Sequence, residues 1–115
     1  EDVRKRVQGL MRSKSEVCVT PINVAELFKV VYLSEDYAQK YQDLFDFLET
    51  VDVLAFNFGA CRLCGLKYAE LKKSGGMTQD TDLLIGAVAL AHCATLVTKN
   101  PRHFQNISGL RVAAW

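Results

Sequence analysis

The most constraining feature of the sequence is a run of apolar and small residues, 83–91, which two acidic residues, Asp80 and Asp82, precede. Carboxylates in the first turn of a helix are stabilised by the macrodipole and by unpaired N–H groups, so the pattern predicts a helix over residues 80–92. The run is too apolar for a surface helix, so we expect it to be buried. Acids at the mouth of a buried helix lie at the rim of a core, where oxygen ligands can hold a divalent cation. Helix capping is the simpler explanation for Asp80 and stays open.

The composition is that of one globular domain. A chain of 115 residues, half of them apolar, is long enough to bury a core. The net charge of +1 argues against strong nonspecific binding of nucleic acid, although a small cleft for single-stranded RNA remains compatible with it. No apolar run approaches the length of a membrane span, and the charged opening residues do not look like a signal peptide. We therefore expect a cytoplasmic protein.

The four cysteines offer little evidence of metal or redox chemistry. Cys18 and Cys93 lie in apolar runs and are interpreted as small core residues. Cys61 and Cys64 form a CxxC pair, but no second pair exists, the two histidines are not at zinc-finger spacing, and the pair falls in an expected helix. The pattern favours reduced, structural thiols.

Hydrophobic periodicity predicts strands that alternate with helices. Ser34 is expected to cap one helix at its N-terminus, Asn57 to cap another, and Gly75 to end the latter. Such alternation is typical of an α/β domain with a mostly parallel sheet. The expected strands cover residues 17–20, 51–56, 94–98 and 110–115, and the expected helices cover residues 2–13, 21–33, 34–50, 58–73, 80–92 and, as one short turn, 101–104.

Polar side chains follow two of these strands, and a third group stands at the helix mouth. Glu26 falls on the second turn after the first strand, and Asn100 follows the strand that ends at Thr98. Ligands of open parallel sheets bind beyond the carboxyl ends of the strands. Glu26, Asp82 and Asn100, with Asp80 nearby, are therefore candidates for a pocket that binds Mg²⁺ or Mn²⁺.

The same residues resemble the PIN domain of the VapC type, the toxin ribonuclease of toxin–antitoxin pairs. Each matching piece is short, but their order and spacing agree along nearly the whole chain. The pieces are TPINVAEL (20–27), DLLIGA (82–87), LVTKN (96–100) with Phe104, and ISGLRV with Trp115 at the end.

The resemblance implies a PIN-like three-layer sandwich, with a mostly parallel central sheet flanked by helices. It also implies an endoribonuclease that depends on Mg²⁺ or Mn²⁺, acts on RNA, forms a homodimer and binds a cognate antitoxin. Glu26 and Asp82 match the family's acidic metal ligands, and Asn100 matches a position that is Asp in many relatives. Asp80 would be an outer group, and Thr98 would support the site through a hydrogen bond.

The chain departs from the family pattern at its start. Members of the family open with a hydrophobic strand that ends in Asp, and we expect this strand to be missing from the sequence given, which starts at Glu1. A missing acid and a neutral Asn100 leave a second possibility, a catalytically inactive PIN-like module that binds RNA or protein. A third possibility is an unrelated α/β domain whose acids are helix caps.

Overall fold

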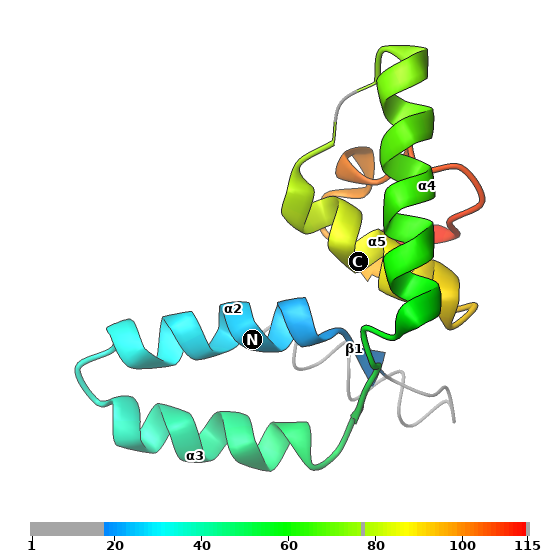
Figure 1. Ribbon diagram of the computed structural model, residues 1–115. Helices are drawn as coiled ribbons and strands as arrows, with labels where there is room; N and C mark the ends of the chain where they lie inside the picture. Colours follow the sequence, from blue (N-terminus) through cyan, green and yellow to red (C-terminus); the bar gives the residue numbers. More distant parts are fainter. Residues whose placement is uncertain (1–17, 77, 115) are drawn as a thin grey trace. The chain divides into compact units, whose positions relative to one another are not determined.

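The computed structural model describes residues 18–76 and 78–114, so the helix expected over residues 2–13 lies outside the described residues. The chain divides into two compact units, Glu1–Leu54 and Ala55–Trp115, and each is described here by itself. Both units combine helices with a pair of parallel strands (Figure 1).

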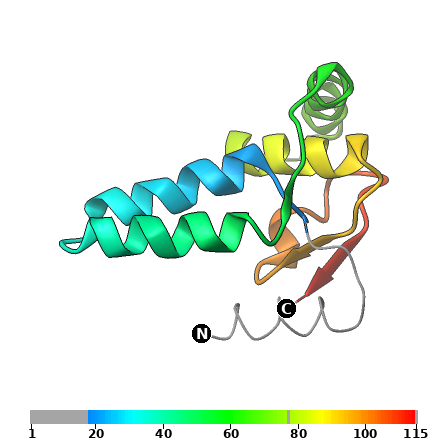
Figure 2. The same cartoon turned by 90° about the horizontal axis from the view of Figure 1, so that it is seen from below.

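The first unit is a helical hairpin followed by a short return strand. Its elements are β1 (Cys18–Val19), α2 (Pro21–Leu33), α3 (Tyr37–Leu48) and β2 (Asp52–Val53). The two strands are parallel, with Cys18 opposite Asp52 and Val19 opposite Val53. The two helices run side by side in both views (Figures 1 and 2). Among the described residues, the expected strand over residues 51–56 is shorter than predicted, with only Asp52 and Val53 paired to β1.

A capping box fixes the start of α2. The Oγ1 of Thr20 accepts the N–H of Asn23 at 3.1 Å, while the Asn23 side chain accepts the N–H of Thr20 at 3.3 Å. Pro21 occupies the first helical turn, where its missing N–H costs nothing. This start places Glu26 on the second turn, as expected.

The N-cap predicted at Ser34 is wrong. Ser34 ends α2 instead, with its N–H donating to the Val31 carbonyl at 3.0 Å and its Oγ donating to the Val30 carbonyl at 2.9 Å. Because both groups are used by the preceding helix, α3 begins later, at Tyr37, after Asp36. Serine suits either end of a helix, and the sequence did not discriminate between them.

The hairpin carries a ladder of aromatic rings that joins its two helices. Ring centroids lie between 5.8 and 6.5 Å apart along the ladder, within the range of aromatic pairs. Most of these rings remain at least 40 % exposed, so the ladder is a surface feature rather than a core. Its members are Phe28 and Tyr32 from α2 and Tyr37, Tyr41 and Phe45 from α3.

The second unit packs two long helices beside a second parallel strand pair. Its elements are α4 (Phe58–Ser74), α5 (Asp80–Ala91), β3 (Leu96–Thr98), the short 3₁₀ turn η1 (Pro101–His103) and β4 (Val112–Ala114). The strands pair from Leu96 opposite Val112 to Thr98 opposite Ala114. Helix α4 begins as expected, with the Asn57 Oδ1 accepting the Ala60 N–H at 2.9 Å, and ends at Gly75 in the left-handed conformation.

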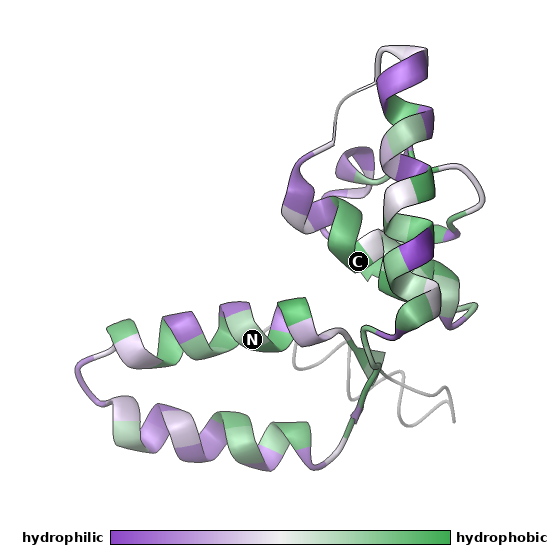
Figure 3. Cartoon of the chain, viewed as in Figure 1, coloured by the Kyte–Doolittle hydropathy of each residue, from purple (hydrophilic) through white to green (hydrophobic). Residues whose placement is uncertain are grey.

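Helix α5 is the core of this unit, as its apolar run predicts. Six of its residues are buried, and Figure 3 shows a hydrophilic first turn that gives way to a hydrophobic run. Gly86 allows a close approach, since a Cβ added there would lie 2.7 Å from the Cδ1 of buried Ile107. The buried residues are Leu83, Ile85, Gly86, Ala87, Val88 and Ala89.

The interpretation of Cys93 as a core residue is wrong. Cys93 is exposed and has φ 54°, a left-handed conformation, because it follows the end of α5 and turns the chain toward β3. Cys61 is also exposed, while Cys18 and Cys64 are half-buried. In the part of the chain that the structure describes, no helix is both long and apolar enough to cross a membrane. The parallel strand pairs and their helices confirm the predicted α/β class.

Candidate functional site

Asp82 lies in the first turn of α5 with a contact that the sequence did not predict. Its side chain is only 17 % exposed, and its Oδ2 lies 3.5 Å from the Nδ1 of His103. His103 is the last residue of η1, and its ring is 54 % exposed. The mouth of the buried helix therefore faces the turn that follows β3.

Thr98 and Asn100 build that turn. The Oγ1 of Thr98 accepts the N–H of Asn100 at 3.0 Å, and the Asn100 carbonyl accepts the N–H of His103 at 3.1 Å. Asn100 precedes the first residue of η1 and has an exposed side chain. The structure thus links Thr98, Asn100, His103 and Asp82 within one unit.

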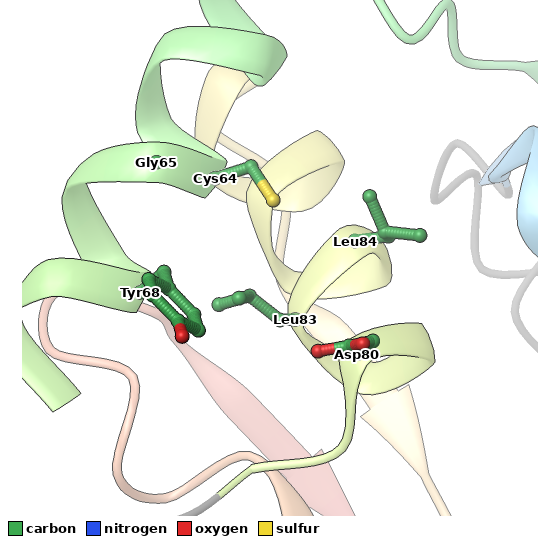
Figure 4. Close-up of a pocket in the computed structure, with 6 residues that line it drawn as sticks. All are labelled: Cys64, Gly65, Tyr68, Asp80, Leu83 and Leu84. Carbon is green, nitrogen blue, oxygen red and sulfur yellow. The ribbon is translucent and has the colours of Figure 1, made fainter. Parts of the chain in front are cut away.

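Asp80 lies on a different surface of α5 from Asp82. Gln79 occupies the N-cap position, and Asp80 is the first helical residue, so Asp80 is not the cap that its position suggested. Asp80 borders an open pocket of about 390 Å³ between α4 and α5 (Figure 4). The other lining residues are Cys64, Gly65, Tyr68, Leu83 and Leu84.

The same pocket explains why the CxxC pair is a poor candidate for chemistry. Burial raises the pKa of the Cys64 thiol, and the neighbouring Cys61 and Asp80 raise it further. A raised pKa reduces the thiolate fraction, which is the reactive and metal-binding form. The pair lies one helical turn apart on α4, as the sequence predicted.

Glu26 belongs to the first unit, where it is an exposed residue on the second turn of α2. The remaining candidates, Asp80, Asp82, Thr98 and Asn100, belong to the second unit. Among residues 18–76 and 78–114, no group of three or more His, Cys, Asp and Glu side chains is arranged to hold a metal ion. The partners that the structure itself brings together are Asp82 and His103.

The two histidines have different surroundings in the structure. The Nε2 of His92, at the end of α5, lies 2.9 Å from the Ala55 carbonyl and ties the helix end to the start of its unit. His103 instead faces an acid. The available signal was its place in the turn after β3, at the sheet edge where ligands of such folds bind.

Two possible ligands of a divalent cation face each other at the start of α5, the partly exposed carboxylate of Asp82 and the imidazole of His103. The exposed residue Asn100 belongs to the same turn as His103. Carboxylate and amide oxygens are the ligands that Mg²⁺ and Mn²⁺ use in proteins, and imidazole is a ligand of transition metals.

Comparisons with known proteins identify one family over nearly the whole chain. The PIN domain family model matches residues 1–110. The chain is 32 % identical to Ribonuclease VapC1 of Haemophilus influenzae (strain R2866) over 113 residues, which are 98 % of this chain and 84 % of that protein. It is 30 % identical to Ribonuclease VapC2 of Rickettsia felis over 106 residues, 92 % of this chain and 79 % of that protein.

A solved structure agrees with the sequence comparisons. The crystal structure of VapBC2 from Rickettsia felis bound to a DNA fragment from its promoter matches with a TM-score of 0.88 and 29 % identity, covering 100 % of this chain and 86 % of that one. An unrelated α/β domain is thereby excluded, and the predicted PIN-like architecture is confirmed. The chain belongs to the PIN domain family and is a relative of the VapC ribonucleases.

Proposed function

We propose that this chain is an endoribonuclease that depends on Mg²⁺ or Mn²⁺, hydrolyses RNA phosphodiesters and acts as the toxin of a toxin–antitoxin pair. The observation that carries the proposal is the partly buried Asp82 at the mouth of α5, which faces the Thr98–Asn100–His103 turn. The names of the relatives, ribonucleases with 30–32 % identity, support the same activity.

Each candidate residue has a role in this proposal. Asp82 and Glu26 hold the cation directly or through water, Asn100 supports it with a neutral oxygen, and Asp80 acts from outside. A divalent cation bound by these groups supplies a nucleophile at neutral pH and neutralises the charge of the phosphate.

The protein's own contribution is positioning. The hydroxyl of Thr98 accepts the backbone N–H of Asn100 and so fixes the backbone from which the Asn100 side chain extends. Buried Leu83 and Ile85 anchor the first turn of α5 and thereby hold the Asp82 carboxylate at the rim. Side chains that already hold their positions before the substrate binds need not rearrange during the reaction.

The test is cleavage of RNA by the purified chain with Mn²⁺, with EDTA, and in the variant Asp82→Asn. We expect EDTA and Asp82→Asn each to abolish cleavage, while the variant keeps its circular dichroism spectrum and loses only a small dipole contribution of about 0.3–1 kcal/mol. Asp46→Asn is the matched control, because this exposed acid on α3 accepts only a hydrogen bond from Gln42 that Asn also accepts. Full activity of Asp82→Asn would contradict the assignment.

A catalytically inactive binding module is the second candidate. Asn100 favours this candidate, because a neutral side chain at this position of the turn holds a cation more weakly than an aspartate would. In that case RNA binds in a gel-shift assay but is not cleaved with any divalent cation, and Asp82→Asn changes neither result.

We also propose an antitoxin partner, a homodimer and a cytoplasmic location. The structural relative from Rickettsia felis is a VapBC complex, which supports a protein partner for this chain. Light scattering of the chain alone and together with its co-expressed antitoxin tests both assemblies. We expect the mass of two chains for the first sample and a larger complex for the second.

A further inference from the structure

The pocket between α4 and α5 combines apolar walls with one carboxylate, that of Asp80. Its volume of about 390 Å³ is in the range of small-ligand sites, and Asp80 is the acid among its lining residues. In Figure 4 the Asp80 carboxylate and the Tyr68 ring lie at the same end of the pocket, with Leu83 between them. Asp80 is exposed, so its oxygens are open to a ligand. The pocket therefore suits an apolar ligand that carries hydrogen-bond donors on one edge.

Gly65 keeps the pocket open, although α4 does not need a glycine at this position. It lies in the interior of the helix, where glycine is less favourable than alanine. A Cβ added there would meet nothing within 4 Å, so no close approach of a neighbour requires the glycine. The missing side chain leaves room in the pocket that Tyr68, three residues later, also lines.

Tyr68 and Lys72 add an aromatic face and a positive charge to the pocket. Tyr68 is 52 % exposed although it lines the pocket, and the Nζ of Lys72 lies 6.0 Å from the centroid of its ring. Aromatic side chains stack on the bases of single-stranded RNA, and lysine side chains bind its phosphates. The ring and the ammonium group are thus placed for one nucleotide and its backbone.

The distribution of charge directs an RNA strand to the unit that carries this pocket. Residues 55–114 have seven Lys and Arg side chains and three Asp and Glu side chains, whereas residues 18–54 have two and seven. A polyanion is attracted to the basic range and repelled by the acidic one. Within the basic range an exposed acid such as Asp80 repels phosphate, so it favours RNA binding only if it accepts hydrogen bonds from a base.

We propose that this pocket binds a guanine base of single-stranded RNA, which stacks on Tyr68 and donates its N1–H and N2 amino group to the Asp80 carboxylate. The inference rests on the proposed function for RNA as the ligand and adds the base that is recognised. A carboxylate only accepts hydrogen bonds, and guanine is the one RNA base with two neighbouring donors on one edge. Asp80 and Asp82 lie about 200° apart around the axis of α5, so the guanine belongs to a nucleotide that flanks the cleaved bond.

The first test measures binding of single-stranded RNA to the full chain in EDTA, which removes the cations that the proposed cleavage needs. The probe is a fluorescein-labelled oligouridine with one central guanosine. Inosine at that position lacks the N2 amino group, and we expect it to weaken binding about tenfold, because a hydrogen bond to a charged group is lost. 7-Deazaguanosine keeps both donors and is expected to bind as guanosine does. Equal anisotropy titrations for guanosine and inosine overturn the inference.

The second test uses variants that locate the preference in the pocket. Asp80→Asn is expected to abolish the difference between guanosine and inosine, because an amide cannot accept both donors of guanine with its one oxygen. Asp46→Asn, at an exposed acid of α3, is the matched control and keeps the difference. Gly65→Leu fills the pocket and is expected to weaken binding of the guanosine strand about tenfold, with an unchanged circular dichroism spectrum. A guanosine preference that survives both pocket variants overturns the inference.

The cleavage assay of the proposed function gives a separate outcome. Cleavage by a chain that binds guanosine and inosine strands equally overturns the inference alone. A guanosine preference without cleavage supports the inference and overturns the nuclease activity. If no strand binds, the inference is overturned whatever the cleavage assay shows.

Discussion

At the scale of single residues, Thr20 combines burial with helix capping. It is 4 % exposed, and its hydroxyl both accepts the Asn23 N–H and donates to the Asn23 Oδ1 at 2.7 Å. Thr20→Val keeps the shape but removes the hydroxyl, so we expect a loss of about 1–2 kcal/mol in the free energy of unfolding. Urea denaturation measures it, and Thr20→Ser serves as the control that keeps the cap. Equal stability of the Val and Ser variants would show that the cap is unimportant.

The thiols of α4 give a second prediction at this scale. Because burial raises the pKa of Cys64, its thiolate fraction at pH 8 is small, and we expect iodoacetamide to modify exposed Cys61 first. Mass spectrometry of peptides after timed labelling gives both rates. Asp80→Asn removes one of the lesser causes of the shift and is expected to accelerate only Cys64. Faster labelling of Cys64 than of Cys61 in the wild type would contradict this account.

At the scale of elements, two glycines of α4 are expected to respond in opposite directions. Gly65 lies inside the helix, and a Cβ added there would meet nothing within 4 Å, so Gly65→Ala should stabilise by about 1 kcal/mol. Gly75 ends the helix at φ 76°, so Gly75→Ala should destabilise by about 1 kcal/mol. Thermal unfolding of the two variants checks the signs. A loss of stability in Gly65→Ala would indicate that the neighbouring pocket depends on the absence of a side chain at position 65.

Local signals predicted the elements whose ends depend on a single residue. Asn57 and Gly75 bound α4 as expected, and the apolar run of α5 is buried as expected. Strands β3 and β4 came out shorter than predicted because pairing with a distant partner, and not β propensity, sets a strand's length. The Asp82–His103 contact escaped prediction for a related reason, since a turn between β3 and β4 creates it. Sequence periodicity indicates which face of an element is apolar but gives no distance between two elements.

At the scale of the whole molecule, acid stability depends in part on a small polar network. The Lys67 Nζ lies 3.1 Å from the Glu70 Oε1 and 2.9 Å from the Ser108 Oγ, and Ser108 donates to Glu70 at 3.0 Å. The network ties α4 to the segment before β4. The hydrogen bonds from Lys67 and then Ser108 lower the pKa of Glu70 below its usual 4.5.

A carboxylate whose pKa is lower in the folded state than in the unfolded chain stabilises the fold at every pH above the unfolded pKa. This contribution to stability is lost as the pH falls through the folded pKa. We therefore expect Glu70→Gln to be less stable than the wild type at pH 7, with the difference shrinking below about pH 4.5, the usual value of this group. Urea midpoints at pH 3 to 7 measure it. A difference that is constant over this range would mean that the charge of Glu70 plays no part.

The aromatic ladder of the hairpin makes the first unit visible to spectroscopy. Three of the chain's four tyrosines, Tyr32, Tyr37 and Tyr41, lie in the ladder with ring centroids 6.0–6.4 Å apart. Chromophores at this distance couple their electronic transitions and give a near-ultraviolet circular dichroism signal that isolated tyrosines lack. The hairpin thus carries a native optical probe, and its melting can be followed without a label.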